Sequence, residues 1–199
     1  KELRAVADEF GILLMYDEVQ CGIGRTGKLY AHEWSGAAPA ILASAKGLGG
    51  GFPIGATPAT EAVADALKAG SHGSTFGGNP LAMAVGNAVL DVVLADRFMD
   101  NVTARAEQLA NGLDALVKKH PDILAGHRGM GLMQGLQCQG ENGENGTLVG
   151  KLMAGGLLTV PAGDNIVRMV PPLTIEATHV EEALSILDAA VGEMTTKAA

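Results

Sequence analysis

Lys46 is the residue of this sequence with the clearest potential for chemistry, because it is the only charged residue between Glu33 and Glu61. It ends a short apolar run, and four of the next five residues are glycine. A lysine kept away from water holds a neutral amine more easily, and a neutral amine forms a Schiff base with an aldehyde. The glycines would let a ligand approach the backbone closely. The alternative is a lysine at a strand end whose ammonium reaches water beside a turn.

Asp17 is the second candidate, because it directly follows the apolar run of residues 12–16. This run predicts a buried parallel strand, so the Asp17 carboxylate should be partly desolvated and should face a cation. Lys46 follows the next predicted strand, and ligands bind at the carboxyl ends of such strands. Pyridoxal phosphate carries both a pyridinium nitrogen for Asp17 and an aldehyde for Lys46. A direct Asp17–Lys46 salt bridge is the main alternative. A metal site is disfavoured, because Asp17 and Glu18 point to opposite faces of a strand.

Two further features could bind anionic groups. Residues 73–78 place the hydroxyls of Ser74 and Thr75 in a glycine-rich loop before a predicted helix, which suits a phosphate, although such a loop can also only turn the chain. Arg168 is the only charged residue between Asp164 and Glu176, and an arginine in apolar surroundings usually forms a bidentate pair with a carboxylate. That carboxylate could belong to a substrate or to this same chain. None of the five histidines suggests a catalytic triad or a metal-binding pair.

The composition excludes several classes of protein. Of the 199 residues, 47% are hydrophobic and 18% are charged, which is enough apolar material for a packed core. The net charge of −8 and the lack of a basic stripe argue against nucleic acid or an anionic membrane surface as a partner. The two cysteines form no motif, so we expect a reducing, cytoplasmic location. No apolar run is long enough to span a bilayer.

The elements that must position these residues follow two patterns. Residues 1–95 have the pattern of an α/β domain, and residues 96–199 that of a small α+β domain. In the first part we expect a helix at 1–10 with one apolar face, buried parallel strands at 12–16 and 41–44, a short helix at 30–34, an extended segment at 53–58, a helix at 61–68 capped by Thr60, and a helix from Pro80 to Val93 capped by Asn79. In the second part we expect a helix from 96 to 119, strands at 123–125, 131–138, 157–160 and 166–170, and helices at 147–154 and 176–194.

Three segments resemble the class III (ornithine-type) aminotransferases in order and in spacing. They are LMYDEVQCGIGRTG at 14–27, AKGLGGGFPIG at 45–55 and HGSTFGGNP at 72–80. The resemblance continues through the chain to VRMVPPL at 167–173. Three ordered blocks of this kind are very improbable by coincidence.

The resemblance implies roles around the ring of a cofactor, pyridoxal 5′-phosphate. Lys46 is expected to hold the cofactor through a Schiff base and to shuttle a proton. Asp17 is expected to keep the pyridine nitrogen protonated, and Gln20 to contact the phenolic oxygen. Cys21 stands where the family usually has threonine, a small change for the chemistry.

The resemblance also implies roles for the anion-binding candidates. Thr75 is expected to bind the phosphate of the cofactor held by a neighbouring subunit, with Ser74 close to the substrate. Arg168 is expected to bind the α-carboxylate of the substrate. The site would therefore be shared between the subunits of a homodimer.

The implied fold is the type I fold of pyridoxal-phosphate-dependent transferases. Residues 1–95 would be the C-terminal part of its large, mainly parallel-sheet domain, and residues 96–199 its small C-terminal domain. Within the family the motifs are most similar to the branch that transfers an amino group between N-acetylornithine, or a related ω-amino acid, and 2-oxoglutarate in arginine or lysine biosynthesis. The family carries as much chain again before Lys1, so this chain alone is expected to be inactive.

Other functions remain open at this point. The same cofactor could serve the transamination of ornithine or 4-aminobutyrate, an aminomutase reaction or a decarboxylation. The chain could also be a catalytically silent folding or dimerisation module. Retention of the cofactor distinguishes the enzymes from the silent module, which predicts none.

Overall fold

The computed structural model describes residues 1–141 and 143–196 of a chain that divides into two compact units. The first unit is Lys1–Met99, and the second begins at Asp100. The sequence predicted a boundary after residue 95, four residues before the observed division. The identification of the two units with a large and a small domain stays a prediction.

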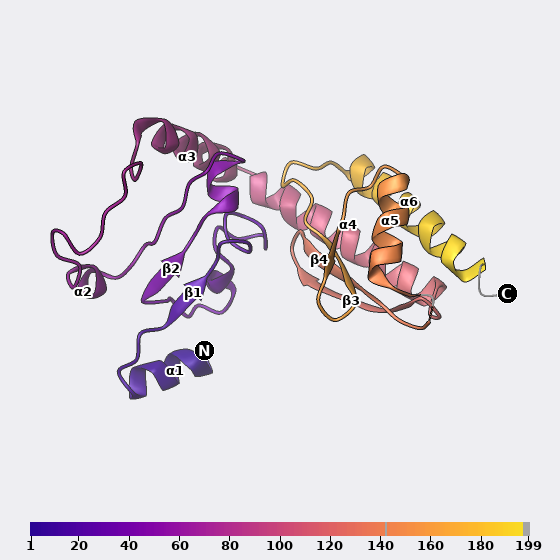
Figure 1. Cartoon of the computed structure of the whole chain (residues 1–199), viewed down its shortest axis with the longest axis horizontal. Helices are drawn as coiled ribbons and strands as arrows, with labels where there is room; N and C mark the ends of the chain where they lie inside the picture. Colours follow the sequence, from indigo (N-terminus) through magenta and orange to yellow (C-terminus); the bar gives the residue numbers. More distant parts are fainter. Residues whose placement is uncertain (142, 197–199) are drawn as a thin grey trace. The chain divides into compact units, whose positions relative to one another are not determined.

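The first unit contains a two-stranded parallel sheet (Figure 1). Strand β1 (Met15–Asp17) pairs with β2 (Ile41–Ala43), and Asp17 lies opposite Ala43. The ladder continues for one residue, since the Glu18 N–H donates to Ala43 O at 2.9 Å. The parallel pairing predicted from the two apolar runs is confirmed. It places the carboxyl ends of both strands at one edge of the sheet.

The expectation that β1 is a buried strand is wrong for this structure. Ile12, Leu13 and Met15 are each 58–59% exposed. The predicted apolar face of helix α1 (Glu2–Glu9) is exposed as well. The physical reason is that β1 has a single neighbour in its sheet among the described residues, so one edge and much of its surface stay open to water.

The remaining elements of the first unit follow the two strands. They are η1 (Ala31–Trp34), η2 (Lys46–Gly49), α2 (Glu61–Ala64) and α3 (Pro80–Val93). Helix α3 starts as predicted, because Asn79 Oδ1 accepts from the Ala82 N–H at 2.9 Å. The helix predicted at 61–68 is wrong in length, and Thr60 provides no side-chain cap. Almost every residue of α2 is exposed, so no packed face stabilises further turns.

A small core holds the segments that follow the two strands. Helix α3 packs against η2, and the buried members of this core are Ile23, Leu48 and Val93. Gly86 of α3 faces Ile54, a partly buried residue that packs against this core. The loop after β1, the turn after β2 and helix α3 therefore fix one another.

The second unit is a four-stranded antiparallel sheet with helices packed on it (Figure 1). Its elements are α4 (Phe98–Lys119), β3 (Leu124–Met130), β4 (Met133–Cys138), α5 (Asn145–Ala154), β5 (Val160–Ala162), β6 (Ile166–Met169) and α6 (Ala177–Thr196). The strand order is β3-β4-β6-β5, and all neighbours are antiparallel. The predicted α+β pattern is confirmed. Strand β3 extends beyond its predicted end because pairing with β4 overrides the poor strand propensity of its glycines.

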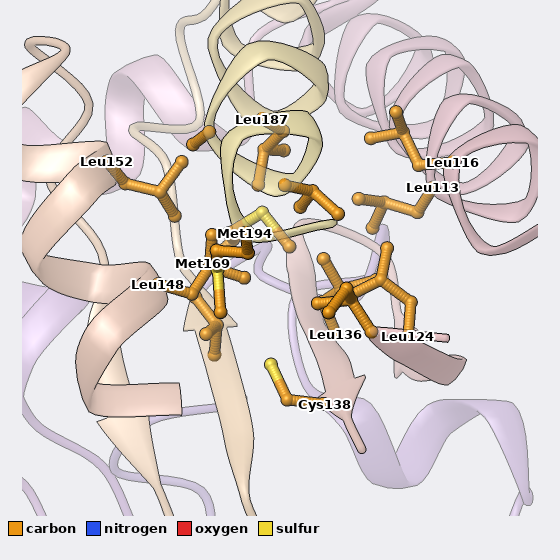
Figure 2. Close-up of a cluster of buried hydrophobic side chains, with 14 of the residues drawn as sticks. Leu113, Leu116, Leu124, Leu136, Cys138, Leu148, Leu152, Met169, Leu187 and Met194 are labelled. Carbon is orange, nitrogen blue, oxygen red and sulfur yellow. The ribbon is translucent and has the colours of Figure 1, made fainter. Parts of the chain in front are cut away.

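The core of the second unit joins the three helices to the sheet (Figure 2). Leu113 of α4, Leu136 of β4, Leu152 of α5 and Leu187 of α6 are fully buried. Each such side chain contributes about 1.5–3 kcal/mol of burial free energy. This core supports β6, the strand that carries Arg168. None of the described helices is long and apolar enough to cross a bilayer.

Candidate active site

The carboxyl ends of β1 and β2 bring Asp17 and Lys46 to the same edge of the parallel sheet. Asp17 is the last residue of β1 and lies opposite Ala43. Lys46 follows shortly after Ala43 as the first residue of η2. Two residues that are distant in sequence thus lie at, and just after, the ends of neighbouring strands, where ligands of parallel sheets bind.

Lys46 has an exposed side chain and a left-handed backbone with φ of +46°. The sequence predicted a lysine kept off the surface, and this is wrong for this structure because nothing described covers the strand ends. The salt bridge with Asp17, the main alternative, is absent from the described part of the chain. A left-handed conformation is costly for a residue with a Cβ atom, and such strained positions cluster at functional sites. Because its side chain is exposed and forms no salt bridge with Asp17, the Lys46 amine is available to a ligand.

Asp17 is also exposed, which contradicts the expected desolvation of its carboxylate. The Val19 N–H donates to Asp17 Oδ1 at 3.0 Å and sets the orientation of the carboxylate. Among the described residues, Oδ2 accepts no hydrogen bond. One fixed oxygen and one open oxygen suit a protonated ring nitrogen, which needs a single anionic acceptor. The two side chains thus fit a ligand with a cationic ring and an aldehyde.

Glu18 is the residue of this site that the sequence analysis missed. It is 2% exposed, and its carboxylate accepts from the Ala31 N–H at 2.6 Å and the His32 N–H at 2.8 Å. Burial and, next, the Glu18 charge raise the pKa of the Cys21 thiol. The alternation along a strand, which turns the residue after Asp17 to the opposite side, was the available signal, but in the sequence it served only to disfavour a metal site. The sequence does not reveal which distant amides that carboxylate meets.

Ser74 and Thr75 lie in the exposed segment that joins α2 to α3. Figure 1 shows this segment standing apart from β1 and β2. The start of α3 offers few donors to a phosphate, because Pro80 lacks an N–H and Asn79 already occupies the Ala82 N–H. A phosphate held here would depend on the two hydroxyls and on the loop amides. The structure does not bring these hydroxyls to the sheet edge of their own chain.

Gln20 and Arg168 occupy two different settings. Gln20 is half-buried in the turn after β1, which the Gly22 N–H closes by donating to Glu18 O at 3.0 Å. Arg168 lies in the second unit, half-buried on β6, and lines a mainly apolar cavity of about 300 Å³. A guanidinium in an apolar cavity is suited to bind a carboxylate through two hydrogen bonds.

Comparison with protein families identifies similar chains. The model of the family described as Aminotransferase class-III matches residues 1–191. The acetylornithine aminotransferase of Mesorhizobium japonicum is 56% identical over 186 residues, which cover 93% of this chain and 46% of that protein. The acetylornithine aminotransferase of Rhodobacter capsulatus is 48% identical over 199 residues, which cover 100% of this chain and 50% of that protein.

Solved structures show the same likeness. The N-acetylornithine aminotransferase from Stenotrophomonas maltophilia matches with a TM-score of 0.87 and 35% identity, over 98% of this chain and 51% of that one. The ornithine δ-aminotransferase of Plasmodium falciparum matches with a TM-score of 0.90 and 31% identity, over 96% of this chain and 49% of that one. The predicted fold class is confirmed by these matches. The chain spans about half the length of the curated relatives it matches.

Proposed function

This chain belongs to the aminotransferase class-III family, whose members depend on pyridoxal 5′-phosphate, and we propose that it forms the lysine-bearing part of a transaminase. The proposed reaction moves an amino group between N-acetylornithine, or a related ω-amino acid, and 2-oxoglutarate in arginine or lysine biosynthesis. Similarity to several acetylornithine aminotransferases supports this substrate class. The observation that carries the proposal is that Asp17 ends β1 and that Lys46 comes three residues after the end of β2, the parallel strand beside it.

The residues of the sheet edge have distinct roles in this proposal. When bound, pyridoxal phosphate supplies an electron-withdrawing ring that stabilises negative charge on the substrate carbon that bears the amino group. Lys46 Nζ holds the cofactor and carries a proton to and from that carbon. Asp17 keeps a proton on the ring nitrogen through Oδ2, while the Val19 N–H holds Oδ1. Gln20 contacts the phenolic oxygen of the ring.

The remaining residues bind the anionic groups of cofactor and substrate. We assign Thr75 to the phosphate of the cofactor in a partner subunit, Ser74 to the neighbourhood of the substrate, and Arg168 to the substrate α-carboxylate. The α2–α3 segment is exposed and stands apart from β1 and β2 in Figure 1, which supports a role toward a second subunit, and hence a homodimer. The apolar cavity around Arg168 supports carboxylate binding, since low polarity strengthens a charged hydrogen-bonded pair. The cytoplasmic location stays a prediction.

The test is covalent capture of the cofactor by the protein that carries this chain. The protein is incubated with pyridoxal phosphate, dialysed, reduced with borohydride and mapped by peptide mass spectrometry. We expect a cofactor label on Lys46 and visible absorbance that survives dialysis. Lys46→Ala should lose both signals. Lys68→Ala, which removes another exposed lysine of the same unit, should keep both.

Two results would contradict the proposal. A label on a different lysine, or retained absorbance in Lys46→Ala, would remove Lys46 from its role. A wild-type protein that retains no cofactor would favour the silent folding or dimerisation module.

A further inference from the structure

Glu18 is a buried carboxylate beside the proposed cofactor residue Asp17, and it does not share the exposed edge of the sheet. We propose that Glu18 is a positioning residue that closes the loop between β1 and η1 and thereby holds Asp17 and Gln20 in place for the cofactor. This inference rests on the proposed function. The closed loop would then orient residues of the site, in addition to stabilising the fold.

The Glu18 carboxylate ties the end of β1 to a segment 13 to 14 residues further along the chain. Oε2 accepts from the Ala31 N–H at 2.6 Å, and Oε1 accepts from the His32 N–H at 2.8 Å. These are the first two amides of η1, which have no acceptor within the helix. Glu18 therefore restrains both ends of the loop that contains Gln20.

The restraint on Glu18 also affects Asp17, because the two are linked through one peptide group. The Glu18 carbonyl and the Val19 N–H belong to the same planar peptide group, so they move together. The carbonyl accepts from the Gly22 N–H at 3.0 Å, while the Val19 N–H donates to Asp17 Oδ1 at 3.0 Å. A Cβ atom on Gly22 would lie 2.8 Å from Glu18 O, so glycine is required for this turn. Fixing Glu18 thus fixes the donor that orients the Asp17 carboxylate.

Two side chains also contact the buried carboxylate: Cys21, whose Sγ donates to Oε2 at 3.8 Å, and His32. Its Nδ1 lies 2.8 Å from Glu18 Oε1. The imidazole lies against two aromatic rings, with centroids 5.9 Å from Tyr16 and 5.8 Å from Tyr30. An amide in place of the carboxylate would turn an N–H toward the backbone N–H of Ala31 or of His32, and a buried donor without an acceptor is unfavourable. Glu18→Gln is therefore a nearly isosteric variant that should release the loop.

The experiment measures cofactor binding by the protein that carries this chain in a double-mutant cycle. Glu18→Gln should raise the dissociation constant of pyridoxal phosphate by about tenfold, the order of effect seen when a residue that orients a ligand-binding side chain is replaced. It should also shift the visible absorbance of the bound cofactor in the same direction as Asp17→Asn. Because Glu18 acts partly through Asp17, the loss of affinity in the double variant should be smaller than the sum of the losses in the two single variants. The matched control is Glu33→Gln, an exposed carboxylate of η1 whose Oε1 accepts from the Tyr30 N–H at 2.7 Å.

The outcomes separate this inference from the proposed function. If the wild type retains no pyridoxal phosphate, the proposed function fails. If the wild type binds but Glu18→Gln matches Glu33→Gln, or if its effect adds fully to that of Asp17→Asn, then only the positioning role is overturned. Should Glu18→Gln fail to fold, the same cycle with His32→Phe decides, because phenylalanine keeps the ring contacts and removes the Nδ1 partner.

Discussion

Replacement of Asn165 tests how the turn before the Arg168 strand is held in the second unit. Asn165 has a left-handed backbone, with φ of +56°, between β5 and β6. Its Nδ2 donates to Cys138 O at 2.9 Å and to Gly143 O at 2.7 Å. Its Oδ1 accepts from the Asn145 N–H at 2.8 Å. One side chain thus joins the end of β4, the segment before α5, and the β5–β6 turn.

The magnitude follows from these contacts and from the backbone. Each of the three hydrogen bonds contributes about 1 kcal/mol net, and a left-handed conformation costs an L-residue about 1–2 kcal/mol. Asparagine tolerates the left-handed conformation better than alanine, so Asn165→Ala loses about 3 kcal/mol of hydrogen bonding and adds up to about 1 kcal/mol of conformational cost, and the free energy of unfolding of the second unit should fall by about 3–4 kcal/mol. Asn165→Gly loses the same bonds without the steric penalty, so its loss should be about 1 kcal/mol smaller.

Urea unfolding with two probes separates the two units. Trp34 is the only tryptophan and lies in the first unit, so its fluorescence reports that unit. Far-ultraviolet circular dichroism is dominated by the long helices α4 and α6 of the second unit. Asn111→Ala, at an exposed position of α4, is the matched control and should change stability by less than about 0.5 kcal/mol.

Two results would refute the reasoning about Asn165. Losses below about 1 kcal/mol for both variants would mean that the three hydrogen bonds contribute little. Equal losses for alanine and glycine would mean that the left-handed backbone is not strained in this turn.

Two further predictions concern titratable groups of the second unit. Asp188 accepts hydrogen bonds from Lys119 Nζ at 2.6 Å and His120 Nε2 at 2.8 Å, and these bonds lower the pKa of its carboxyl in the folded state. The ionised carboxylate therefore stabilises the folded state above the unfolded pKa, and this contribution is lost as the pH falls through the folded pKa. Asp188→Asn should therefore lower the free energy of unfolding by about 0.5–1 kcal/mol at neutral pH and should have no effect in strong acid. In urea titrations, a difference between variant and wild type that does not change with pH would contradict this prediction. Burial raises the pKa of Cys138 to about 11, so a thiol reagent at mildly alkaline pH should spare it in the native chain and label it after unfolding. Mass spectrometry checks this against the half-buried Cys21, and rapid native labelling of Cys138 would be the contrary result.

Local chemistry determined much of what the sequence revealed. The Asn79-Pro80 pair starts α3 because a cap and a proline act on the nearest amides, within one turn. The apolar runs at 12–16 and 41–44 predicted strands that do pair in parallel, although β1 is exposed and not buried as expected. The isolated charge at Arg168 predicted a side chain in apolar surroundings, and it lines an apolar cavity. Each of these inferences depends on neighbours along the chain.

Tertiary structure decided what depends on distant partners. Asp17 and Lys46 are exposed because nothing described covers their strand ends, and no pattern around either residue reports what lies above it. Glu18 has its place in the loop through the amides of Ala31 and His32, which sequence spacing does not identify. Thr75 lies in a segment away from the sheet edge for a similar reason, since the path of a glycine-rich loop is set by packing. Capping and periodicity depend on residues that are close in sequence, whereas burial and long-range hydrogen bonds arise only when separate segments meet in the folded chain.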